Sequence, residues 1–196
     1  MNSFLALSPL AQYFFFLTLI FIPLAGVAGY IRIRWGKPLR PKRQRYIAAI
    51  VMQWVILAAT VMAAKVEGIT LLGPRWGSPF LWIAVAAYMV FIAVRMRAAW
   101  AKLRDARKEK ALILLPDDPR LMRLWVGVAA MAGVTEECAY RGLAYQLLRG
   151  MGFDVSLAVL ICVTAFAIGH MTQGWRGVLG TFILALLFHG LVFAAG

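Results

Sequence analysis

The chain has 196 residues, of which 63% are hydrophobic, with a mean hydropathy of +0.79 and a formal net charge of +13. A water-soluble domain is usually about 45–50% apolar, so this composition excludes an ordinary soluble protein. The charge does not indicate nucleic-acid binding, because Lys and Arg lie in short segments between long uncharged blocks. That arrangement is typical of membrane helices flanked by positive charge that meets anionic lipid.

The first half of the chain predicts three membrane spans, since a span needs roughly 20 mostly apolar residues. They run from Leu10 to Ile33, from Ile47 to Ala64 and from Pro79 to Val94. Pro23 is expected to perturb the first of these helices, which membrane proteins tolerate when neighbours satisfy the freed backbone groups. Residues 1–31 contain no charged side chain, so no cleaved signal peptide is predicted.

The second half predicts three more spans, from Arg120 to Arg149, from Val155 to Met171 and from Gly177 onward. Segments 31–46 and 95–110 each contain seven Lys or Arg residues, so we expect both on the cytoplasmic side. The prediction is therefore a single all-α domain, a polytopic bundle of about six spans with its N-terminus outside. Residues 1–113 would hold the first three spans and residues 114–196 the catalytic core.

The fourth span contains three charged residues, Glu136, Glu137 and Arg141. Each charge at mid-membrane costs on the order of 2.5–3.5 kcal/mol on insertion scales, so these side chains must face an interior or a wet cavity. Glu137 and Arg141 are four residues apart and can form an ion pair on one helix face. Glu136 is turned by about 100° from Glu137 and is free to act on a different partner.

Two histidines lie in the apolar spans that follow. His170 shares a helix face with Phe166. A single histidine at a helix end is often only an interfacial polar group, but Glu136 and Glu137 on a neighbouring helix favour a site shared with them. His189 is expected to make a helix–helix hydrogen bond, with a catalytic role as the alternative. Cys138 and Cys162 do not form a metal-binding or disulfide pattern and are expected to be small buried residues.

A carboxylate and an imidazole in one enclosed site are compatible with two mechanisms. In one, Glu136 takes a proton from water while His170 stabilises the oxyanion. In the other, Glu136 and His170 ligate a divalent metal such as zinc, which activates the water. A zinc site would normally need three protein ligands, and the sequence does not decide between the two.

The residues Glu136-Glu137-Cys138-Ala139-Tyr140-Arg141 and Phe166 to His170 resemble the Glu-Glu-x-x-x-Arg and Phe-x-x-x-His motifs of the CPBP (Abi) family. That family includes type II CAAX prenyl endopeptidases and bacteriocin-immunity proteins, and the resemblance covers about residues 114–196. It implies an intramembrane endopeptidase, often described as a metalloendopeptidase, in a bacterial cytoplasmic membrane. Its partners would be membrane lipid and a membrane-tethered or lipidated substrate, with no nucleic acid.

The resemblance also implies a role for each matching residue. Glu136 would be the main catalytic glutamate supported by Glu137, Arg141 would be structural, and His170 would assist the water or the oxyanion. Tyr140 and Phe166 would contribute to packing or substrate contact.

A third family motif, His-x-x-x-Asn or His-x-x-x-Asp, is not matched, because Phe193 stands four residues after His189. Either His189 replaces the missing histidine or the polypeptide is truncated and inactive. Two other readings therefore stay open: a non-catalytic immunity or accessory protein, and a proton- or ion-coupled transporter component that uses Glu136 and Glu137 as carriers.

Overall fold

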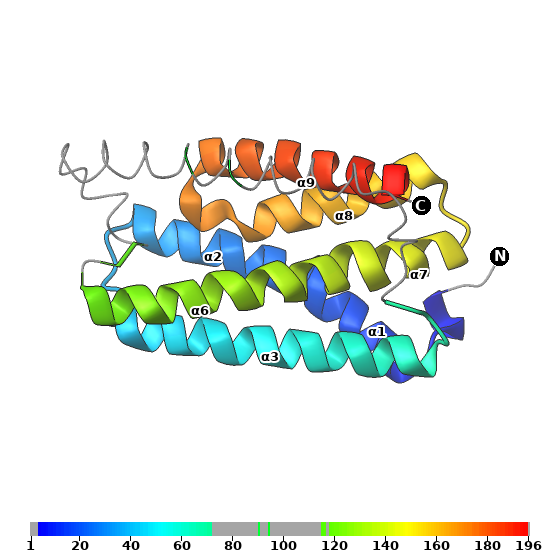
Figure 1. Cartoon of the computed structure of the whole chain (residues 1–196), viewed down its shortest axis with the longest axis horizontal. Helices are drawn as coiled ribbons and strands as arrows, with labels where there is room; N and C mark the ends of the chain where they lie inside the picture. The colour runs from blue at the N-terminus through cyan, green and yellow to red at the C-terminus, as the bar shows by residue number, and fades with distance from the viewer. Residues whose placement is uncertain (1–3, 72–89, 91–93, 95–114, 117, 196) are drawn as a thin grey trace.

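The computed structural model describes residues 4–71, 90, 94, 115, 116 and 118–195, which are drawn in colour in Figure 1. Within these residues the chain forms helices joined by short turns and contains no strand, so the predicted all-α class is confirmed. The predicted span Pro79–Val94 lies outside the described residues except for Val90 and Val94, which are helical. The basic segment 95–110 lies wholly outside them.

The N-terminal part forms a helical hairpin that contains the first two predicted spans. After a 3₁₀ turn η1 (Phe4–Ala6), a continuous rod is built from α1 (Pro9–Phe16), the π-helical η2 (Leu17–Phe21) and α2 (Ile22–Arg34), and α3 (Lys42–Val66) returns beside it. The Ser8 side chain caps the first helix by accepting a hydrogen bond from the Ala11 amide at 3.2 Å. Gly36, with φ +64°, lets the chain turn between α2 and α3.

The C-terminal part forms a second set of helices. A rod made of α6 (Pro119–Glu136), the π-helical η3 (Glu137–Ala144) and α7 (Tyr145–Gly150) is followed by α8 (Val155–Gly169), the 3₁₀ turn η4 (Met171–Gln173) and α9 (Trp175–Ala195). Asp118 and Asp154 cap α6 and α8. The fifth predicted span was too long by two residues, because the chain leaves the α-helix at His170 and reverses through Gly174 at φ +82°.

Three helical segments among the described residues are long and apolar enough to cross a bilayer: Pro9–Arg34, Lys42–Val66 and Trp175–Phe193. The apolar helix α8 is shorter. Large apolar side chains on the outside of the bundle, such as Leu24, Trp54 and Leu187, are more than half exposed. An apolar exterior of this kind is suited to lipid rather than to water.

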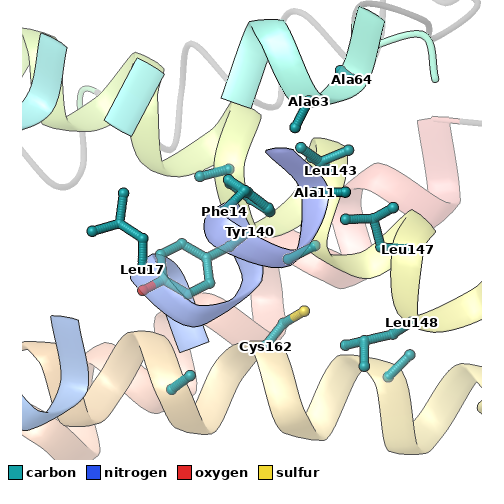
Figure 2. Close-up of a cluster of buried hydrophobic side chains, with 14 of the residues drawn as sticks. Ala11, Phe14, Leu17, Ala63, Ala64, Tyr140, Leu143, Leu147, Leu148 and Cys162 are labelled. Carbon is teal, nitrogen blue, oxygen red and sulfur yellow. The ribbon is translucent and has the colours of Figure 1, made fainter. Parts of the chain in front are cut away.

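The helices run side by side along the long axis of the molecule, with α6 along α3, α2 along α8, and α8 along α9 (Figure 1). The tightly packed part of the interior lies where α1, η3 and the first turns of α8 meet (Figure 2). Small residues such as Ala11, Ala63 and Ala139 are completely buried there and let the helices approach closely. The buried residues labelled in Figure 2 are Ala11, Phe14, Leu17, Ala63, Ala64, Tyr140, Leu143, Leu147, Leu148 and Cys162.

The two π-helical segments, η2 and η3, are joined by one buried hydrogen bond. In η2 the amide of Ile22 bonds to the carbonyl of Leu17, and the next residue, Pro23, has no N–H to offer to Thr18. The Tyr140 hydroxyl donates to the Thr18 carbonyl at 2.9 Å and satisfies it. The predicted perturbation at Pro23 therefore takes the form of a π-helical segment whose freed carbonyl is bonded by another helix.

Candidate active site

A cavity of about 340 Å³ lies between α2, α3, the junction of α6 with η3, and the end of α8. Glu136 and His170 both line it, so the two residues that the sequence analysis paired face one interior space. The wall is mostly apolar, with side chains such as Ile22, Met52 and Ile56. Its other polar lining residues are Gln53, Thr135, Tyr140 and Thr172.

The two adjacent glutamates face in different directions. Glu136 is the last residue of α6 and lines the cavity, whereas Glu137 begins η3 and is not among the lining residues. The Glu137 side chain is 48% exposed. Successive residues of a helix are turned by about 100°, so this divergence follows directly from their adjacency.

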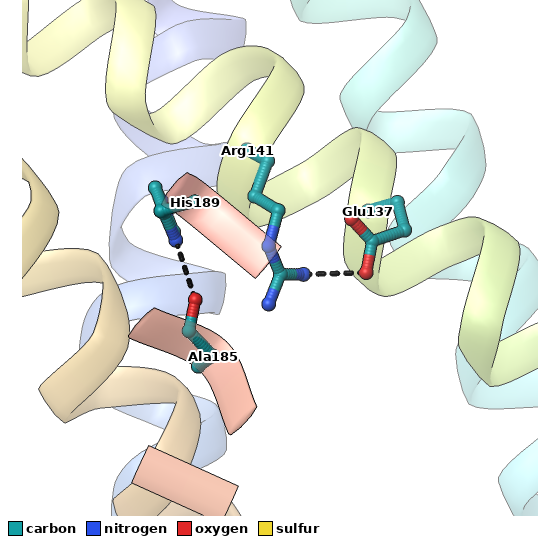
Figure 3. A network of polar contacts seen from close by, with 4 residues as sticks. All are labelled: Glu137, Arg141, Ala185 and His189. Atoms are coloured by element: carbon teal, nitrogen blue, oxygen red, sulfur yellow. Dashed lines mark hydrogen bonds and ion pairs between the residues drawn. The ribbon is translucent and has the colours of Figure 1, made fainter. Parts of the chain in front are cut away.

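The Glu137–Arg141 ion pair expected from the four-residue spacing is present, with Arg141 Nη1 donating to Glu137 Oε1 at 2.6 Å (Figure 3). The Arg141 guanidinium is buried and lies against the rings of Phe166 and Phe188, at 5.6 and 5.1 Å from their centroids. Its planar group can bind a carboxylate and stack on aromatic rings at once. Arg141 thus connects η3 to both α8 and α9.

Phe166 contacts three of the residues in the two motifs. Its ring centroid lies 4.6 Å from that of His170 and 5.1 Å from that of Tyr140, and it also packs against Arg141. Its carbonyl accepts a hydrogen bond from His170 Nδ1 at 2.9 Å. Because a carbonyl can only accept, Nδ1 carries a proton, and Nε2 is the ring nitrogen left for chemistry in the cavity.

His170 is held at its position by a close approach of two helix backbones. A Cβ atom built on Gly26 of α2 would lie 2.6 Å from the carbonyl oxygen of Gly169 and 2.7 Å from that of Ile168. A Cβ on Gly29 would lie 2.7 Å from the Thr172 side chain. The end of α8 and the turn after it therefore rest directly on the glycine face of α2.

His189 does not line this cavity. Its Nδ1 donates to the Ala185 carbonyl of its own helix at 3.1 Å (Figure 3), so the expected helix–helix hydrogen bond is not the one observed. The ring is buried, packs edge-on against Tyr145, and leaves Nε2 without a hydrogen-bond partner among the described residues. A polar side chain in a helix can bond to the backbone carbonyl one turn earlier, and the sequence does not show whether His189 uses that carbonyl or a group on another helix.

Three residues that line the cavity are not predicted from the sequence: Gly26, Gln53 and Thr135. Thr135 Oγ1 donates to the carbonyl of Gln53 at 3.4 Å and links α6 to α3 beside Glu136. Gln53 could have been found from the sequence, because it places a side-chain amide within the apolar span 47–64 and polar groups in spans usually face the interior. Cys138 and Cys162 are both free thiols; Cys162 is buried as expected, whereas Cys138 is only partly buried.

The described residues do not fit a three-ligand metal site. No three His, Cys, Asp or Glu side chains among them come together in a way that could hold a metal ion. Glu136 and His170 supply two donors to the cavity, whereas a catalytic zinc normally takes three from the protein.

The fold and the site define a helical membrane protein with an interior cavity that holds a carboxylate and an imidazole. Residues 118–196 match the sequence model of the family described as type II CAAX prenyl endopeptidase Rce1-like. This match confirms the resemblance predicted from the two motifs, and at the level of the family it indicates a peptidase. Comparison with curated proteins and with solved structures found no match.

Proposed function

We propose that this protein is an intramembrane endopeptidase that cleaves a membrane-tethered substrate of the CAAX type. The observation that carries the proposal is that Glu136 and His170, from different helices, line one cavity inside a membrane bundle. The family match over residues 118–196 supplies the reaction class. The apolar walls suit a substrate that enters with a lipid chain or an apolar peptide segment.

The proposed reaction uses one water molecule. Glu136 accepts a proton from the water, whose oxygen attacks the scissile carbonyl carbon. When the His170 ring carries a proton on both nitrogens, Nε2–H can donate to the oxyanion. Glu136 then returns its proton to the leaving nitrogen as the C–N bond breaks, so that water is consumed and two peptide products form.

We further propose that Glu137 acts indirectly. Its ion pair holds Arg141 against Phe166, and Phe166 holds His170 through the hydrogen bond to Nδ1. Glu137 would therefore support the position of the imidazole rather than exchange protons with the substrate.

We infer a six-span topology with the N-terminus outside. Ten described Lys or Arg residues lie at one end of the bundle, the end at which α2 finishes and α3, α6 and α9 begin (Figure 1): Arg32, Arg34, Lys37, Arg40, Lys42, Arg43, Arg45, Arg120, Arg123 and Arg176. Among the described residues, the opposite end has Lys65 and Arg149 balanced by Glu67 and Asp154. The strongly basic end is the expected cytoplasmic end, and substrate would approach from there or from the surrounding lipid.

The test is a cleavage assay in proteoliposomes with a peptide that ends in a prenylated cysteine and three further residues. We expect the wild type to cleave after the cysteine, and Glu136→Gln and His170→Ala to lose at least about 100-fold in kcat/KM, because each removes a group needed in the transition state. Asp154→Asn is the matched control. Asp154 caps α8 and does not line the cavity, and asparagine caps a helix as well as aspartate does.

Two outcomes would count against the proposal. Equal cleavage by the wild type and Glu136→Gln would remove Glu136 from the reaction, and no cleavage by a folded wild type would remove the peptidase function for this substrate. The same assay with a chelator tests the metal-free chemistry, for which we expect unchanged turnover.

A further inference from the structure

We propose that Gln53 is a water-positioning residue of this site, which holds the attacking water together with Glu136. The inference rests on the proposed function. Gln53 lies in α3, outside the region that matches the family, so neither motif nor family comparison points to it.

The helix contact beside the cavity sets the position of Gln53. Its carbonyl accepts the hydrogen bond from Thr135 Oγ1, and Thr135 directly precedes Glu136. Thr135 is completely buried, so this contact holds α3 against α6 at the helical turn that contains Glu136. Gln53 and Glu136 both line the cavity, and the contact between Gln53 and Thr135 places the two residues beside each other in its wall.

The chemistry of the amide decides how Gln53 can act. An ionised carboxylate only accepts hydrogen bonds, so within the Gln53 amide only Nε2 can donate to Glu136. The Oε1 atom is buried and has no hydrogen-bond partner among the described residues. A buried acceptor without a partner is uncommon, and this one belongs to a side chain that lines the cavity.

A water molecule matches the two acceptors better than a peptide N–H does. A group placed between the Glu136 carboxylate and Gln53 Oε1 must donate two hydrogen bonds, and water has two O–H bonds whereas a substrate amide has one N–H. With one O–H directed to each acceptor, a lone pair of the water oxygen remains for attack on the scissile carbonyl. Glu136 takes the proton, and Gln53 takes none, so its role is orientation.

The test separates kcat from KM for Gln53→Leu and Gln53→Met in the proteoliposome assay. Leucine and methionine are close to glutamine in size but lack the amide group. We expect kcat to fall on the order of 10- to 100-fold while KM stays within about twofold, because the water is misplaced but the substrate contacts remain. In the Glu136→Gln background neither variant should lower the residual rate further.

Gln146→Leu is the matched control, because the Gln146 amide bonds to the carbonyls of Gly142 and Thr70 at 2.7 and 3.2 Å and does not line the cavity. This variant should lower thermal stability in detergent but leave kcat near the wild-type value. An unchanged kcat in Gln53→Met, or a rise in KM alone, would overturn the inference. Either result with an active wild type leaves the peptidase proposal intact, whereas an inactive wild type removes both.

Discussion

Replacing Gly26 by alanine tests whether the backbone contact between α2 and α8 sets the position of His170. The new Cβ would lie 2.6 Å from the Gly169 oxygen, about 0.8 Å inside the 3.4 Å at which ordinary contact begins. The atoms it meets are backbone carbonyls, which cannot rotate away as a side chain would. We therefore expect α8 and the turn after it to move away from α2 and to take His170 with them.

The size of the effect follows from that displacement. Inserting a methyl group into a packed interior costs about 1–3 kcal/mol of stability. A misplacement of about 1 Å at a reacting group can cost on the order of 100-fold in rate, so a shift of about 0.8 Å predicts a loss of roughly 10- to 100-fold in kcat/KM. The thermal unfolding midpoint in detergent and the cleavage of the prenylated peptide in proteoliposomes measure the two quantities separately.

Gly180→Ala provides the matched control, because a Cβ at Gly180 of α9 meets nothing within 4 Å. It should leave both quantities unchanged. In addition, Gly26→Ala should lower the rate little once His170 is already alanine, since both changes act through the same side chain. A Gly26→Ala protein with wild-type kcat/KM would refute the claim that this contact determines where the imidazole lies.

Three further predictions concern the supports of the site and its orientation. Tyr140→Phe should lower the free energy of unfolding by about 1–2 kcal/mol, as judged by thermal melts, because the Thr18 carbonyl loses its donor; an unchanged melt would show that another group satisfies it. Arg141→Lys keeps the charge but loses the planar contact with Phe166 and should cost about 1 kcal/mol in the same measurement, whereas equal stability would mean that charge alone matters. In a background without native cysteines, a membrane-impermeant maleimide should label Lys37→Cys only from the cytoplasmic side and Asp154→Cys only from the opposite side, and the reverse pattern would contradict the topology.

Much of the fold follows from the sequence because the apolar blocks are bounded by charges and prolines. The Glu137–Arg141 pair follows from its four-residue spacing, and the shared cavity of Glu136 and His170 follows from the cost of isolated polar groups in lipid. The first inference uses the spacing of residues within one helix, and the second uses the large free-energy cost of placing a charged side chain in lipid. Neither requires knowledge of contacts between distant helices.

The remaining features depend on contacts between distant helices. Pro23 predicts a carbonyl without a helical donor, but nothing near it in the sequence identifies Tyr140 as the group that satisfies it. The π-helical geometry of η3 arises from a change in backbone bonding that no residue type specifies. The importance of Gly26 becomes visible only when the end of α8 is seen lying against it.

The shared use of Phe166 makes the two motifs mechanically dependent on each other. The ring supports the guanidinium of one motif, while the carbonyl of the same residue fixes the imidazole of the other. A change in either motif should therefore alter the apparent effect of a change in the other, and single-substitution effects in the two should not add. For design, grafting only the glutamate helix or only the histidine helix onto another bundle should not reproduce a reactive pair.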